Sequence, residues 1–227
     1  MTEEDRRHSV ASEASLVADE QARAEFEARN GLIQFDRACQ MIIEAIDRGA
    51  AWKLRPSSIL TLHRSALEGL SPYAGNFRPS SVEIQGSGHK PVDAHRVPEL
   101  IEDMCDYVNT NWSEKNAVHL ASFIMWRLNW IHPFSDGNGR TSRMVSYVVL
   151  CVRLGMLLPG GNTIPDQIVD NRLPYFEALE AADKADLEGA LNLSKMEELI
   201  ENMLAVQLAG LMEAATGKHY LHSDDGE

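Results

Sequence analysis

The feature that most constrains this sequence is a short polar stretch, residues 132–143, that separates two apolar helical patterns. Before it, apolar residues recur at helical spacing: Val118, Leu120, Ala121, Ile124, Met125, Leu128 and Ile131. After it, the spacing resumes with Met144, Val145, Tyr147, Val148, Cys151 and Leu154. The pattern predicts two buried helices joined by a charged, glycine-containing loop, and such a loop is more typical of a ligand site than of a core.

The residue types in this loop favour binding of phosphate groups. Pro133 is expected to end the first helix, because the residue before a proline is disfavoured in the α region, and this leaves His132 at the helix exit. Gly137 and Gly139 allow a positive φ and let a ligand approach the backbone. We expect the second helix to begin near Gly139, where its unpaired N–H groups and the positive end of its dipole suit an anion.

Charged side chains complete this predicted anion site. Arg140 and Arg143 lie on neighbouring positions of the first helical turn, and two guanidinium groups beside free amides suit more than one phosphate. Asp136 places one carboxylate beside the anion, which suits Mg²⁺ bridged to substrate phosphates. Each feature is more often structural when it occurs alone, but their combination in this order favours the functional interpretation.

Residues 132–143 read HPFSDGNGRTSR. Every specified position agrees with the signature H-x-F-x-[DE]-G-N-G-R-x-x-R, so the chain resembles the Fic (filamentation induced by cAMP) family. The phosphorylating Doc branch typically has Lys in place of the second glycine, whereas Gly139 is similar to the AMP-transferring branch. The resemblance implies an all-α, Fic-like helical domain with a small β-hairpin flap, which transfers AMP from ATP to a hydroxyl side chain of a target protein.

The resemblance also implies a role for each motif residue. His132 would take the proton of a Ser, Thr or Tyr hydroxyl, a task that suits an imidazole with an ordinary pKa of about 6.5. Asp136 would hold Mg²⁺, and the phosphates of ATP would be bound by Gly137, Asn138, Gly139, Arg140 and Arg143. Transfer of UMP, phosphate or phosphocholine, and removal of AMP, are alternatives on the same site. A nucleotide-sensing module is the non-enzymatic alternative, but a binder needs neither His132 nor Asp136.

Residues 73–90 are the one stretch with strand character. Val82, Glu83 and Ile84 belong to an alternating run that is followed by a Gly-Ser-Gly turn at 86–88. A surface hairpin is the ordinary interpretation. The resemblance implies a flap over the active site that aligns the target segment by main-chain pairing, and residues 75–78 and 89–91 are similar to its family context.

A second stretch, residues 171–179, reads NRLPYFEAL. It resembles the family pattern N-R-x-x-Y-Y-x-x-L, with Phe176 in place of the second tyrosine. The resemblance implies that Asn171 hydrogen-bonds the adenine and that Tyr175 stacks on it. An N-capped core helix explains the same residues equally well.

The N-terminal residues contain a candidate inhibitory motif. Many Fic-like proteins carry [ST]-x-x-x-E-[GN] on a helix whose Glu pairs with the second arginine of the signature. Residues 9–14, SVASEA, match except at the last position, which implies that Glu13 pairs with Arg143; a solvated residue in a frayed tail is the alternative. Glu198 fits the same spacing but is better explained by a capping box at 194–197, and a separate inhibitory protein is the remaining possibility.

Composition limits the partners and the organisation of the chain. The 227 residues, 44% of them hydrophobic, predict an N-terminal segment over 1–20, a Fic-like helical domain over 21–212 and an acidic tail over 213–227. A net charge of −13 argues against nucleic acid or an anionic membrane as the main partner. Three widely spaced cysteines favour buried thiols and a cytoplasmic location. The expected partners are a target protein and the chain itself, through self-modification; the oligomeric state stays open.

Overall fold

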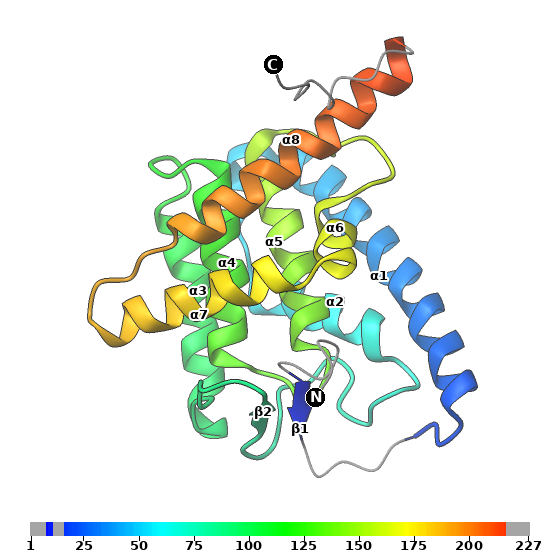
Figure 1. Cartoon of the computed structure of the whole chain (residues 1–227), viewed down its shortest axis with the longest axis vertical. Helices are drawn as coiled ribbons and strands as arrows, with labels where there is room; N and C mark the ends of the chain where they lie inside the picture. Colours follow the sequence, from blue (N-terminus) through cyan, green and yellow to red (C-terminus); the bar gives the residue numbers. More distant parts are fainter. Residues whose placement is uncertain (1–7, 11–15, 217–227) are drawn as a thin grey trace, which may run out of the picture. The chain divides into compact units, whose positions relative to one another are not determined.

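The computed structural model of the chain describes residues 8–10 and 16–216, with side chains described over 16–210 (Figure 1). The chain forms two compact units, one ending at Met156 and the other beginning at Leu157. The described residues are mostly helical, which confirms the expected fold class.

The first unit contains five α-helices, two short 3-10 helices and two strands within the described residues. They are β1 (His8–Val10), α1 (Glu20–Arg48), η2 (Gly49–Ala51), α2 (Pro56–Leu67), β2 (Glu83–Gln85), η3 (Ala94–Arg96), α3 (Val97–Thr110), α4 (Ala117–Ile131) and α5 (Asn138–Leu154). The described part of the second unit contains α6 (Ile164–Asp170), α7 (Leu173–Leu187) and α8 (Ser194–Thr216).

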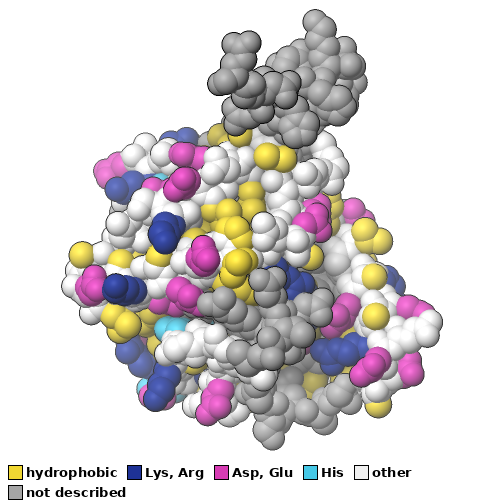
Figure 2. Space-filling model, in the orientation of Figure 1, with side chains coloured by type: hydrophobic (Ala, Val, Ile, Leu, Met, Phe, Trp, Pro, Cys, Tyr) yellow, Lys and Arg dark blue, Asp and Glu magenta, His cyan; other side chains and the backbone are white. Residues whose placement is uncertain are grey.

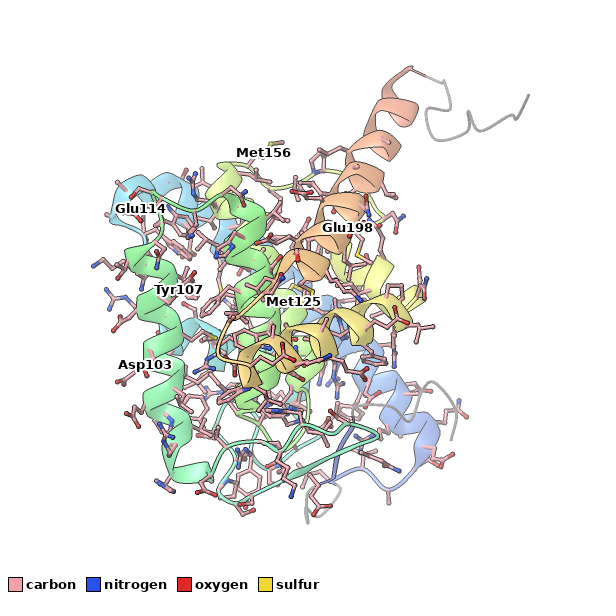
Figure 3. All side chains as sticks on the ribbon, turned by 60° about the vertical axis from the view of Figure 1, so that its left-hand side comes forward. Asp103, Tyr107, Glu114, Met125, Met156 and Glu198 are labelled. Atoms are coloured by element: carbon pink, nitrogen blue, oxygen red, sulfur yellow. The ribbon has the colours of Figure 1, made fainter. Side chains whose placement is uncertain are left out.

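Helices α4 and α5 form the centre of the first unit. They pack against each other, and α1 and α2 both pack against α5. Most residues of α4 and α5 are buried, as expected for helices that are covered on nearly every side. On α3, which packs against α4, Asp103 is exposed, whereas the Tyr107 hydroxyl lies 2.9 Å from Nε2 of His119 on α4 (Figure 3). The loop between α4 and α5 is thus held by a packed helical scaffold.

Helix α1 buries a polar face that its apolar periodicity did not predict. The apolar spacing in this helix predicts a core side that includes Leu32 and Ile33, but these two side chains are 71% and 47% exposed. Asn30 is buried and donates through Nδ2 to the carbonyl oxygen of Glu68 at 2.8 Å, just past the end of α2. Gln34 donates to the carbonyl oxygen of Leu62 at 3.1 Å. Amide side chains on α1 therefore satisfy backbone acceptors of α2 and its end, which apolar residues cannot do.

The β-hairpin predicted within residues 73–90 is not formed. The expected strand exists as β2, in which Ile84 is buried between exposed neighbours. Its antiparallel partner, however, is β1 from the N-terminal segment, with Ser9 opposite Ile84. A three-residue edge strand pairs with whichever extended segment reaches it, and sequence proximity does not decide that partner. The N-terminal segment over 1–20, in which an inhibitory helix was considered, has a β-strand conformation at residues 8–10. Glu13 lies outside the described residues.

The second unit is held by amides that bind backbone groups of its own loops. Helices α6 and α7 both pack against α8. On α8 the buried Gln207 donates to the carbonyl oxygen of Pro159 at 3.1 Å and accepts from the N–H of Ile164 at 3.2 Å. Gln167 of α6 donates to the carbonyl oxygen of Met203 at 3.0 Å.

The surface and the cysteines agree with the composition. Acidic side chains are spread over the face that Figure 2 shows, in keeping with a net charge of −13. Cys105 and Cys151 are buried thiols, as expected, whereas Cys39 is only partly buried, and burial raises the pKa of Cys105 to about 12. No helix among the described residues combines the length and the apolar character that crossing a membrane requires.

Candidate active site

The candidate base, His132, directly follows the last residue of α4. It has φ 53° and ψ 59°, a left-handed conformation that non-glycine residues rarely adopt. Its backbone N–H still closes the helix by donating to the carbonyl oxygen of Leu128 at 3.0 Å. The ring is buried, and Nδ1 lies 3.3 Å from the carbonyl oxygen of Asn129. Because a carbonyl only accepts, Nδ1 carries the proton of the neutral ring and Nε2 is the basic nitrogen.

Arg78 contacts the backbone on which His132 is mounted. Its Nε donates to the carbonyl oxygen of His132 at 2.8 Å, and its backbone N–H donates to the carbonyl oxygen of Pro133 at 2.9 Å. The remaining guanidinium nitrogens donate to the carbonyl oxygens of Ser80, at 2.9 Å, and of Val92. Residues 78–92, here called the flap segment, contain β2, so Arg78 contacts both this segment and the candidate base. The sequence identified Arg78 only by its family context.

Asn138 closes the loop through its side chain. Its Oδ1 accepts from the N–H of Phe134 at 2.9 Å, and its Nδ2 donates to the carbonyl oxygen of the same residue at 2.7 Å. The amide that was expected to contact phosphate is therefore engaged with the loop backbone. Helix α5 begins at Asn138, with Gly137 as its N-cap and no side-chain cap, so the backbone N–H groups of its first turn are the donors that the loop offers to an anion.

His63 of α2 fixes the loop from the opposite side. Its Nδ1 accepts from the N–H of Gly75 at 3.0 Å, so Nε2 carries the proton and donates to the backbone oxygen of Asp136 at 3.0 Å. Burial lowers the pKa of His63 to about 4, and the ring is neutral near pH 7. The ring also stacks on Phe134, with centroids 3.7 Å apart. Gly137 has φ 76°, and a Cβ there would overlap the Leu67 side chain, so both backbone and packing require glycine.

Asp136 belongs to a charge network that extends to α1. Its Oδ2 lies 3.3 Å from Nη2 of Arg23 and 3.3 Å from Nη2 of Arg140. Glu27 Oε1 lies 3.2 Å from Nε of Arg23 and 3.6 Å from Nη1 of Arg140. The other carboxylate oxygen of Asp136 accepts from the N–H of Gly137 at 2.6 Å. Arg23 and Glu27 were not predicted from the sequence, because both look like ordinary polar residues of a surface helix.

The donor set suits a metal held mainly by substrate oxygens. Within the described residues no group of three or more His, Cys, Asp or Glu side chains could enclose a metal ion. Asp136 supplies a single carboxylate beside the N-terminus of α5, an arrangement that fits Mg²⁺ bound together with phosphates. Arg143 folds back along α5, since a Cβ placed on Gly139 would lie only 3.2 Å from its Nη1.

The other predicted residues lie in different parts of the chain. Asn171 is the exposed C-cap of α6 and Tyr175 is buried on α7; both belong to the second unit, and their adenine contacts stay predictions. The alternative interpretation, an N-capped core helix, holds only in part: Tyr175 and Phe176 are buried, but α7 has Arg172 at its N-cap position and no side-chain cap. Glu198 is exposed on α8 of the second unit (Figure 3).

Comparison with known proteins agrees with the geometry of the loop. The model of the Fic/DOC family matches residues 53–150. The chain is 27% identical over 196 residues to protein adenylyltransferase fic-1 of Caenorhabditis briggsae and 29% identical over 193 residues to protein adenylyltransferase Fic of Drosophila willistoni. Each match covers 79% of this chain but 36% of the relative, so the chain spans only part of the length of these proteins.

Solved structures share the fold. Fic-1 from C. elegans superposes with a TM-score of 0.62 at 21% identity, over 83% of this chain and 52% of that chain. A Fic domain containing signaling protein from Bacteroides thetaiotaomicron gives a TM-score of 0.58 at 22% identity, over 85% of this chain and 75% of that chain. The motif, the family match and the common fold agree: the chain contains a Fic/DOC family domain.

Proposed function

We propose that the chain is a protein adenylyltransferase that moves AMP from ATP to a Ser, Thr or Tyr hydroxyl of a target protein. The observation that carries this proposal is the placement of His132. Its Nδ1 donates to the carbonyl oxygen of Asn129, which makes Nε2 the basic nitrogen. His132 directly follows α4 and begins the loop that leads into the N-terminus of α5. The names of the similar proteins from C. briggsae and D. willistoni support the same activity.

The proposed reaction is an in-line displacement on the α-phosphorus of ATP. His132 takes the proton of the target hydroxyl at Nε2, the hydroxyl oxygen forms the new bond to the α-phosphorus, and the bond to the bridging oxygen breaks. Pyrophosphate leaves with the electron pair of that bond. Placement and charge stabilisation would supply most of the rate enhancement, as in other phosphoryl transfers.

The loop supplies the charge stabilisation. The backbone N–H groups of Gly137, Asn138 and Gly139 and the guanidinium groups of Arg140 and Arg143 would bind the phosphates, and the N–H of Gly137 would first have to leave the Asp136 carboxylate. Mg²⁺, when bound, would neutralise the α- and β-phosphate oxygens, and Asp136 would be its protein ligand. Asp136 contacts Arg23 and Arg140 in this structure, so the metal would replace these cations at the carboxylate.

The edge of β2 is the proposed docking site for the target, and the backbone of Val82, Glu83 and Ile84 would pair with it. The pairing of β1 with β2 supports this assignment, because this edge accepts an antiparallel strand in main-chain register, and a target strand would take the place of β1. Asn171 and Tyr175 are the proposed adenine contacts. Self-modification is part of the proposal, since a segment of the same chain already lies along this edge.

Labelled ATP tests the proposed reaction. Purified chain, with and without a cell lysate, is incubated with Mg²⁺ and with ATP labelled at either the α- or the γ-phosphate. We expect α-label on protein in the wild type and none with His132→Ala, while calorimetry shows ATP bound by both, because the base does not hold the phosphates. Label from the γ-phosphate would identify a kinase, and binding without any label would favour the nucleotide-sensing module.

UMP or phosphocholine transfer is separated by the mass added to the protein. Transfer of AMP adds an adenylyl group to the intact chain or to the target, and UTP or CDP-choline in place of ATP would leave the mass unchanged. If UTP or CDP-choline modifies protein and ATP does not, the assignment of AMP is wrong. Loss of label from a pre-adenylylated substrate would instead show AMP removal.

A further inference from the structure

The flap segment is bound near both of its ends to residues 130–133, where α4 ends. At one end Arg78 donates from Nε to the carbonyl oxygen of His132 at 2.8 Å and from its backbone N–H to that of Pro133 at 2.9 Å. At the other end Nε2 of His89 donates to the carbonyl oxygen of Trp130 at 2.7 Å. Three acceptors within four consecutive residues of the chain therefore bind the segment that contains β2.

The guanidinium group of Arg78 connects the His132 backbone to both ends of the flap segment. Besides the carbonyl of His132, Arg78 binds the carbonyl oxygens of Ser80 and Val92, which lie near the two ends of the flap segment. The side chain is 2% exposed, and burial lowers the pKa of its guanidinium while the Asp93 carboxylate opposes that shift. The guanidinium group has a fixed, planar set of donors, which suits several backbone acceptors around one buried cation.

The conformation of His132 explains why such a contact is needed. A left-handed residue at a helix end is strained unless its surroundings hold it there. The carbonyl of His132 lies past the last residue of α4, where the helix itself provides no donor, and Arg78 supplies one. Without it, the backbone of His132 would be free to relax toward an ordinary conformation, and the ring would turn with it.

We propose that Arg78 is a positioning residue that holds the base and the target-docking strand in one fixed arrangement. This inference rests on the proposed function of His132 and β2. Arg78 acts through the His132 backbone and through the two ends of the flap segment. A target strand that pairs with β2 is then placed relative to the base by the contacts of one side chain.

Two substitutions test the proposal kinetically. Arg78→Lys keeps the charge but cannot reach three acceptors, and Arg78→Met keeps only the apolar stem. We expect the kcat of AMP transfer to fall by about 100-fold in both, as a small misplacement of a catalytic group can cause. The KM for ATP should change by less than about twofold, since the phosphate donors stay in place. Arg96→Lys, on an exposed arginine of η3 that pairs with Glu99, is the matched control.

A kcat for Arg78→Lys and Arg78→Met equal to that of Arg96→Lys overturns the proposal. A loss of ATP affinity as large as the loss of kcat also overturns it, because Arg78 would then support the whole site rather than the base. If Arg78→Met fails to fold, Arg78→Lys decides by the same two measurements.

Hydrogen exchange provides a readout that is independent of activity. In Arg78→Lys, the amides of peptides covering 81–86 and 128–134 should both exchange faster than in the wild type, and those of α1 should not. Faster exchange in only one of the two peptides contradicts the coupling. If the wild type transfers no AMP, the proposed function fails, whereas joint exchange of these peptides still shows that Arg78 links the flap segment to His132.

Discussion

Removing Arg23 should strengthen the response of the site to Mg²⁺. Arg23 reaches from α1 to Asp136, with Nη2 3.3 Å from Oδ2, and Arg140 contacts the same oxygen at the same distance. A metal ion that binds Oδ2 of this carboxylate would compete with both guanidinium groups. Arg23→Gln removes one competitor and keeps a side chain of similar length, so the concentration of Mg²⁺ needed for half-maximal ATP binding should fall.

The size of this effect follows from the exposure of the pair. Both side chains are 38% exposed, and ion pairs of this kind contribute about 0.2–1 kcal/mol. Breaking a pair worth about 0.7 kcal/mol corresponds to about a threefold change in apparent affinity. Arg140 remains in place, so a gain much larger than about fivefold is not expected. Because the pair is partly solvated, the difference between variant and wild type should shrink as salt is raised toward 1 M.

Two calorimetric titrations of ATP, one in EDTA and one across a range of Mg²⁺ concentrations, measure the effect. Loss of a positive charge can weaken metal-free ATP binding, so the informative quantity is the gain produced by Mg²⁺ in each protein. Arg37→Gln is the matched control, because Arg37 lies exposed on the same helix and bonds Gln40. A gain in Arg23→Gln no greater than in Arg37→Gln would refute the competition. Asp136→Ala should abolish the gain; if it does not, Asp136 is not the metal ligand.

Three further predictions follow from the flap segment, the N-terminal segment and α2. Ile84→Pro removes an N–H from the edge of β2 and should impair labelling of protein targets while sparing ATP binding by calorimetry; an unchanged labelling rate would mean that β2 does not dock the target. Glu13→Gly should raise self- or target-labelling well above wild type, and equal rates would direct attention to Glu198 or to a separate inhibitor. The pKa of His63 is about 4 in the folded state, below its ordinary value. As the pH falls, the unfolded state therefore binds the proton first, and the free energy of unfolding decreases between about pH 6.5 and 4. Urea unfolding should show a loss of about 2 kcal/mol between pH 7 and 4.5 beyond that of His63→Gln, and identical pH dependence in the two proteins would contradict this.

The local part of the site was predictable because its signals lie within a few residues of one another. Pro133 predicts the end of α4, and the structure ends that helix at Ile131. The two glycines predict a turn into a second helix, which begins at Asn138, one residue before the expected Gly139. Short-range stereochemistry of this kind depends little on the rest of the fold, so sequence was enough to place His132, Asp136 and Arg140 around one loop.

The residues that support the loop were not predictable, because their roles arise from contacts across long stretches of chain. Arg23 lies 113 residues from Asp136, His63 lies 73 residues from it, and Arg78 lies 54 residues from His132. Each of them resembles an ordinary polar residue of a helix or turn. The partner of β2 and the buried amides of α1 were missed for the same reason: periodicity predicts which residues are apolar, whereas backbone acceptors left at helix ends decide where a buried Asn or Gln is required.

Asn138 shows how the side chain of a motif residue can serve the site by ordering the backbone of the loop. Its side chain binds both backbone groups of Phe134, and His63 holds the next part of the loop through the carbonyl of Asp136. These bonds order the loop independently of nucleotide, so the N–H groups of α5 need little reorganisation when phosphates arrive. Donors that are fixed in advance stabilise developing charge better than donors that must be ordered during the reaction. The neutral His63 fits this role, because a cation there could not accept the N–H of Gly75 and would release one side of the loop.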